Sequence, residues 1–285
     1  MRIGIGLPNQ VRDMDPAVVP GWARRAEAAG FSSVATSGRV SYPGLMDTVA
    51  LAAAAGATSR VGLVSTVLVA PVWPPVLLAK ELAGIDAVSG GRLTVGVGLG
   101  GRADDYVAEA HPARGRGRRL DADLEVYHRV WAGEPVGGGN PAVPAGTRPV
   151  PLIFGGTVPA SFARMARWGA GYTTGGVPVP MVAGAFDAAR AAWQAAGREG
   201  RPRLVAMAYF ALGNPAAGIK NVSDYFGHGG DDFVNLVVGS LAQTADQVRE
   251  AVRGHAEIGA DELILHPTTD DPDEIERLAE LVLPS

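Results

Sequence analysis

The chain has 285 residues, a formal net charge of −4 at pH 7 and a charged-residue content of 19%. Proteins that bind nucleic acids or membrane surfaces need a concentrated basic face, so this balance argues against both kinds of partner. The sequence contains no cysteine, which excludes disulfides, thiol nucleophiles and cysteine-ligated metals.

The first part of the chain alternates between strand-like and helix-like segments. We expect strands over residues 2–7 and 31–37, each followed by a helix, and neither a signal peptide nor an apolar run long enough to cross a membrane. The segment 61–101 reads as a complete strand, helix and strand, with a proline-marked helix start and a Ser-Gly-Gly stop. Units of this kind build parallel sheets. We therefore expect a cytoplasmic α/β protein.

The remainder continues the alternation and adds two longer segments. Residues 102–117 form a polar insertion without a clear helix, and a helix with one apolar face follows. The segment 214–239 is predicted to be irregular and to form an active-site lid. The last helix is expected to start in a capping box formed by Asp271 and Glu274. Further strands are expected over residues 151–154, 171–174, 204–212 and 262–265.

Eight βα units whose strands are apolar on both faces predict a closed (β/α)8 TIM barrel. We expect a single domain over residues 1–285, with insertions after the fourth and seventh strands. An open, doubly wound sheet is the alternative.

The predicted strand ends carry small residues and bare backbone where a barrel places its site. This pattern leaves room for a large flat cofactor that is held mainly through main-chain groups and carries the reaction itself. The segments concerned are Ser37-Gly38, Ser65-Thr66, Gly98-Leu99-Gly100-Gly101, Gly155-Gly156-Thr157 and Gly175-Gly176.

Two of these glycine segments permit a more specific interpretation. Gly155-Gly156-Thr157 precedes a helix, so its amides and the helix N-terminus can hold a phosphate, although a tight βα turn is the alternative. The segment 96–101 has GxGxxG spacing, but it follows the fourth strand and lacks the helix that should receive a pyrophosphate. We interpret Gly98 and Gly100 as a close approach of backbone to a cofactor, with Arg102 as a polar contact. A purely structural glycine strand is the alternative.

The five histidines differ in position. His266 follows the last predicted strand and is our candidate catalytic residue, which would orient substrate or donate a proton; a structural histidine is the alternative. His128 and His255 fall within predicted helices and are assigned to packing, while His111 and His228 lie in the two longer segments and are left open. No HExxH motif, carboxylate cluster or nucleophile elbow occurs, so we predict neither a metal site nor a hydrolase.

The segment 61–101 also combines three short motifs in a fixed order. They are Thr66-Val67-Leu68 followed by Ala70-Pro71, Pro75 followed by Leu77-Leu78-Ala79-Lys80, and Ser89-Gly90-Gly91-Arg92 followed by Gly96-Val97-Gly98. This order resembles the luciferase-like monooxygenase superfamily of flavin and deazaflavin enzymes. The resemblance covers nearly the whole chain, and it is also clear over residues 121–133 and 239–267.

The resemblance implies an enzyme, a flavin-dependent monooxygenase. It would use reduced FMN, supplied by a separate flavin reductase, and dioxygen to oxygenate a small organic substrate, and it would form a homodimer. One alternative is a hydride-transfer oxidoreductase that uses the 8-hydroxy-5-deazaflavin coenzyme. Another is a flavin-binding protein without turnover.

The resemblance also implies where the cofactor binds. It places a cis peptide between Thr66 and Val67, next to Ser65, against the central ring of the cofactor, and it places the phosphate arm at the loop Gly155-Gly156-Thr157. Together with these residues we expect cofactor contacts at Gly98, Gly100, Arg102, Gly175 and Gly176. Two positions depart from the family pattern: Ser37-Gly38-Arg39 stands where many relatives have an acidic residue or histidine, and Leu99 stands where luciferase has an arginine beside the phosphate.

Overall fold

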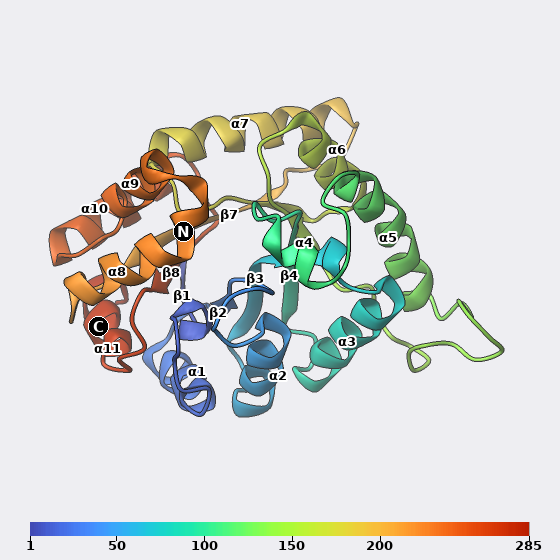
Figure 1. Ribbon diagram of the computed structural model, residues 1–285, viewed down its shortest axis with the longest axis horizontal. Coiled ribbons are helices and arrows are strands. Elements are labelled where there is room, and N and C mark those ends of the chain that lie inside the picture. Colours follow the sequence, from blue (N-terminus) through green and yellow to red (C-terminus); the bar gives the residue numbers. More distant parts are fainter. Residues whose placement is uncertain (285) are drawn as a thin grey trace.

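The computed structural model describes residues 1–284, in which eight parallel strands close into a barrel inside a ring of helices (Figure 1). Each strand pairs with its neighbours in sequence, and β8 also pairs with β1, so the predicted barrel is confirmed and the open sheet is wrong. The strands are β1 (Arg2–Gly6), β2 (Ser33–Thr36), β3 (Gly62–Val69), β4 (Leu93–Gly98), β5 (Leu152–Phe154), β6 (Gly171–Thr173), β7 (Arg203–Phe210) and β8 (Glu262–Pro267).

Helices follow every strand and cover the outside of the barrel (Figure 1). They are α1 (Val18–Ala29), α2 (Asp47–Ala57), α3 (Pro75–Val88), α4 (Asp104–Ala108), α5 (Arg116–Trp131), α6 (Pro159–Trp168), α7 (Val179–Ala195), α8 (Pro215–Phe226), α9 (Asp231–Gly239), α10 (Ala245–Glu257) and α11 (Glu274–Val282). Short 3-10 turns lie at η1 (Pro8–Gln10), η2 (Ala70–Val72) and η3 (Gly227–Gly229). None of the helices within residues 1–284 is long and apolar enough to cross a membrane.

The segment 214–239 is helical, so the prediction of an irregular segment is wrong. The side chain of Asn214 accepts a hydrogen bond from the Ala217 amide, and Pro215 occupies the first turn, which together start α8. Asp231 and Asp232 lie in the first turn of α9, where negative charge is favourable. The intervening run of glycines concealed both helices, because it interrupts the apolar periodicity.

Two smaller predictions also need correction. The polar insertion after β4 contains the short helix α4. The predicted capping box at α11 does not form, since the Glu274 side chain is fully buried and accepts hydrogen bonds from the Leu212 and Gly213 amides after β7. Glu274 therefore anchors the loop that leads into α8.

The core lies in two places. Inside the barrel is a single small layer, and between the barrel and the helices is a much larger cluster that includes the predicted face of α5. The layer inside the barrel comprises Ala35, Val64, Ile153, Val205 and Ile264. The outer cluster packs the helices against the barrel.

Glu262 closes the barrel at the N-terminal ends of the strands. It accepts hydrogen bonds from Ser32 and Ser33 on the β2 side and pairs with Arg2 of β1 and Arg203 of β7. Burial favours the neutral acid, but these hydroxyls and guanidinium groups hold the pKa of Glu262 below its ordinary value. The first, second, seventh and eighth strands are thus joined through one carboxylate.

Candidate functional site

Two connected cavities open at the C-terminal ends of the strands. The glycine cavity, of about 500 Å³, lies over the ends of β4, β5 and β6. The lid cavity, of about 310 Å³, lies beside it, under α8 and α9. The residues that line both are Thr66, Val67, Gly100, Gly175, Val177 and Phe233.

A bulge in β3 lies where the two cavities meet. The pairing of β3 with β4 shifts register between Ser65 and Leu68, and the peptide bond between Thr66 and Val67 is cis, as the resemblance implied. A Cβ atom placed on Gly98 would lie 2.5 Å from the Val67 side chain, and one on Gly155 would lie 3.2 Å from it. These two glycines therefore have a packing reason that the sequence does not reveal, since they leave room for Val67.

The glycine cavity presents hydroxyl groups and backbone amides. Gly156 has a φ of +111°, and its carbonyl accepts a hydrogen bond of 3.0 Å from the Tyr172 hydroxyl. The Thr173 and Thr174 hydroxyls are buried without a hydrogen-bond partner among residues 1–284. Thr157 and Ser161 line the cavity at the start of α6, and no aspartate or glutamate of the described chain does so. A polar, anion-tolerant group fits this lining, because buried hydroxyls need partners and a helix start favours negative charge.

The candidate catalytic residue His266 lies beneath the cavity floor. It is fully buried and lines neither cavity. The Thr66 hydroxyl donates to the Thr36 carbonyl at 3.1 Å, so its oxygen accepts from His266 Nε2, 2.9 Å away. Burial lowers the pKa of His266 to about 3, which keeps the ring neutral at ordinary pH. The structure therefore connects His266 to the site through Thr66, and does not bring it to the cavity surface.

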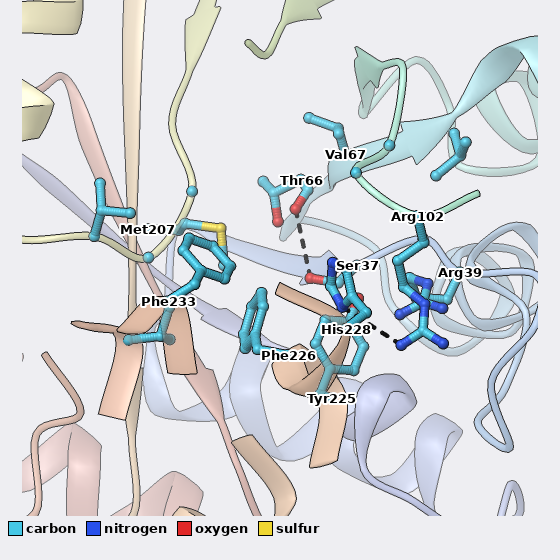
Figure 2. Close-up of a pocket in the computed structure, with 18 of the residues that line it drawn as sticks. Ser37, Arg39, Thr66, Val67, Arg102, Met207, Tyr225, Phe226, His228 and Phe233 are labelled. Carbon is cyan, nitrogen blue, oxygen red and sulfur yellow. Dashed lines mark hydrogen bonds between the residues drawn. The ribbon is translucent and has the colours of Figure 1, made fainter. Parts of the chain in front are cut away.

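The lid cavity has one polar wall, formed by the loops after β2 and β4. Arg39 pairs with the buried Asp105, and Arg102 pairs with Asp104. His228 of η3 approaches from the lid, with its Nδ1 3.5 Å from Arg102 Nη1. Figure 2 shows Arg39 and Arg102 on one side of the cavity, with His228 and Tyr225 beside them.

The opposite wall of the lid cavity is apolar and largely aromatic. Tyr225 and Phe226 come from α8, Phe233 from α9, and Met207 and Tyr209 from β7. Figure 2 shows Phe226, Phe233 and Met207 on the side away from the arginines. The segment 214–239, which the sequence predicts to be a lid, contributes Tyr225, Phe226, His228, Phe233 and Val237 to the lining of this cavity.

The structure brings most of the sequence-derived site residues together. Thr66, Val67, Gly98, Gly100, Gly155, Gly156, Thr157 and Gly175 line the glycine cavity, and Arg102, Gly175 and Gly176 line the lid cavity. Ser65 lines neither cavity, since its hydroxyl is buried and donates to the Gly96 carbonyl. Sequence reasoning named Arg39 and left His228 open without assigning either to the site, and it missed the aromatic side chains of the lid. A helical interpretation of α8 would have placed Val222, Tyr225 and Phe226 on one face and so pointed to them.

Comparisons with known proteins agree with this architecture. A family model described as luciferase-like monooxygenase matches residues 1–268. The uncharacterized protein Rv0940c of Mycobacterium tuberculosis strain H37Rv is 30% identical over 178 residues, which span 51% of this chain and 61% of that protein. The matched region thus covers less than two thirds of this curated relative.

Two solved structures share the whole fold. The monooxygenase RslO1 from Streptomyces bottropensis is 25% identical, with a TM-score of 0.77 over 100% of this chain and 99% of that one. An F420-dependent secondary alcohol dehydrogenase, solved with an F420-acetone adduct, has a TM-score of 0.79 at 17% identity, over 99% of this chain and 98% of that one. The second likeness is one of fold alone.

Proposed function

The chain belongs to the luciferase-like monooxygenase family, and on this premise we propose that it is a flavin-dependent monooxygenase that acts on a small organic substrate. It would use reduced FMN, delivered by a separate flavin reductase, and dioxygen. The protein's own task in such an enzyme is to bind, orient and exclude water.

The pair of connected cavities is the observation that carries the proposal. One cavity offers hydroxyls and amides without acidic side chains, and the other is apolar on one wall and polar on the opposite wall. They meet at Thr66 and Val67, at the end of the barrel where such folds hold their sites. A cofactor in the glycine cavity would thus face a substrate in the lid cavity.

The residues of the glycine cavity fit the cofactor. Thr157, Ser161 and the first amides of α6 would hold the phosphate, and the unpaired Thr173 and Thr174 hydroxyls would receive polar groups of the cofactor. When bound, the reduced flavin would supply the electrons that activate dioxygen. Thr66 and Val67 would fix its ring, and the helices of the lid would keep bulk water away.

The likeness to RslO1 favours oxygenation over hydride transfer. That monooxygenase is 25% identical over the full chain, whereas the F420-dependent dehydrogenase is 17% identical and supports only the fold. The deazaflavin enzyme is therefore kept as an outcome of the test.

The proposal is tested by titrating the protein with FMN, riboflavin and F420 and measuring binding by fluorescence quenching. FMN should bind more tightly than riboflavin by about tenfold or more, because FMN carries a phosphate that riboflavin lacks. The double variant Thr157→Val, Ser161→Ala should remove most of that difference, while the surface variant Thr147→Val should keep it. FMN-loaded protein, reduced without oxygen and then mixed with aerated buffer, should consume dioxygen faster than free reduced FMN at the same concentration.

Three results would contradict the proposal in different ways. Selective binding of F420 would indicate hydride transfer instead. Tight FMN binding without accelerated oxygen consumption would indicate a flavin carrier. Absence of binding to any of the three ligands would remove the flavin assignment altogether.

A further inference from the structure

We propose that the lid cavity binds an aromatic carboxylate, with its ring against the aromatic wall and its carboxylate against Arg102 and Arg39. If the proposed function holds, this aromatic carboxylate is the substrate; the binding site itself does not depend on that function. The inference follows from the chemistry of two facing walls: one is aromatic, and the other holds guanidinium N–H donors that lack acceptors.

The aromatic wall is built around Phe226. Its ring meets those of Tyr225, Tyr209 and Phe233 edge to face, with centroids 4.9, 5.7 and 5.6 Å away and interplanar angles of 73°, 69° and 79°. Such packing leaves ring faces and edges to which another aromatic ring can add at favourable geometry. Met207 adds a polarisable sulfur on the same side (Figure 2).

The carboxylates of the polar wall are already satisfied. Asp105 accepts from Arg39 Nε at 2.9 Å and from the Val40 and Ser41 amides at 3.0 and 2.8 Å. Asp104 accepts from Arg102 Nε and Nη2 and from the Asp105 amide. Neither acid therefore needs a further donor from a ligand.

The two guanidinium groups, in contrast, keep unused donors. The Arg39 side chain is only 9% exposed. Its Nη1 atom is buried and has no hydrogen-bond partner among residues 1–284. The Nη1 of Arg102 has a single long contact of 3.5 Å, to His228. Burial and the nearby Arg102 lower the pKa of His228, so its ring is mostly neutral at pH 7 and adds no charge to this wall.

A carboxylate is the ligand group that best completes this wall. It offers two oxygens with several lone pairs, and guanidinium groups bind it in a fixed geometry. A neutral alcohol or carbonyl would satisfy fewer of the free N–H groups. The cavity, of about 310 Å³, lies at the small end of ligand sites, which favours an acid with one or two rings.

Calorimetric titration with 2-naphthoate, 2-naphthalenemethanol and octanoate tests the inference, on the purified protein with and without FMN. The three probes separate the carboxylate from the ring. We expect 2-naphthoate to bind at least about tenfold more tightly than the neutral alcohol and than the aliphatic acid.

Variants assign the effect to the two walls. Arg102→Gln should weaken 2-naphthoate about tenfold and leave 2-naphthalenemethanol within about twofold, and Arg102→Lys should give an intermediate loss for the acid. Phe226→Leu should weaken both aromatic probes and spare octanoate. Arg167→Gln, on the exposed side of α6, is the matched control and should change none of them.

Equal affinity for 2-naphthoate and the alcohol, an unchanged Kd in Arg102→Gln, or no binding of 2-naphthoate at all would overturn the inference. Circular dichroism of each variant separates a binding defect from a folding defect. Flavin binding is measured independently, so a protein that binds FMN but not 2-naphthoate contradicts this inference alone. A protein that binds 2-naphthoate but no flavin keeps the carboxylate site and loses the proposed reaction.

Discussion

At the scale of single residues, Val67 determines what its neighbours can be. Its side chain projects over the ends of β4 and β5, where Gly98 and Gly155 leave the space that it occupies. The glycine-rich strand end is thus a consequence of the bulge in β3. The Val67 side chain thus shapes the cavity floor by occupying the space that Gly98 and Gly155 leave free.

Gly98→Ala should therefore destabilise the protein through a clash with Val67. The new methyl group would lie 2.5 Å from Val67 Cγ2, which should cost about 1–3 kcal/mol of unfolding free energy. In a Val67→Ala background the same substitution should cost much less, because the clashing atoms are gone. Urea unfolding of the four proteins in this cycle measures the coupling. Additive losses would show that Val67 is not the reason for the glycine.

His266 should give the protein a pH-dependent stability. Its pKa is about 3 in the folded state and near 6.5 in an unfolded chain. Between these two pH values the unfolded state binds a proton at His266 and the folded state does not. The contribution of His266 to the unfolding free energy is therefore complete above pH 6.5 and is lost as the pH falls toward 3. In His266→Gln the titration is absent.

The stability difference between wild type and His266→Gln should consequently shrink by about 2 kcal/mol between pH 7 and pH 5. Urea unfolding at the two pH values measures it. Parallel changes in both proteins would mean that the imidazole is accessible to protons in the folded state.

At the scale of elements, local patterns predicted the barrel well, because the sequence of each βα unit contains its own signals for a strand, a helix start and a glycine stop. The same local patterns failed where the signal is long-range. Glu274 has the sequence position of a capping residue, yet its carboxylate holds the amides of Leu212 and Gly213, some sixty positions away. Nothing near Glu274 in the chain encodes that contact.

The site followed the same division. Gly155-Gly156-Thr157 could be located from sequence because a strand end, a glycine turn and a helix start are adjacent in the chain. The polar wall could not, since Arg39 meets Asp105 only when the loops after β2 and β4 fold together. His266 was predicted to follow the last strand, whereas it lies within β8. A sequence also does not tell whether a side chain points to the cavity or below its floor.

At the scale of the whole molecule, the two ends of the barrel have different tasks. The C-terminal end carries both cavities, whereas the N-terminal end carries the ion network of Glu262. Stability and ligand binding should therefore respond to different substitutions, as is general for this fold.

Glu262→Ala should lower the unfolding free energy by about 3 kcal/mol, because it leaves Arg203 and two serine hydroxyls without their buried partner. FMN affinity, measured at a temperature where the variant is folded, should stay within about twofold of wild type. Glu276→Ala, which removes an exposed pair with Arg25, should cost less than about 1 kcal/mol. Equal losses of unfolding free energy in the two variants would show that Glu262 does not stabilise the closed barrel.

The pairing of β8 with both β7 and β1 has a consequence for how the protein is made. While the chain is still emerging from the ribosome, β8 is missing. The edges of β1 and β7 that pair with β8 in the finished barrel therefore remain exposed. The floor beneath Thr66 also depends on His266, which is among the late residues. The proposed flavin should thus bind only after release of the finished polypeptide, and nascent chains stalled before β8 should remain colourless.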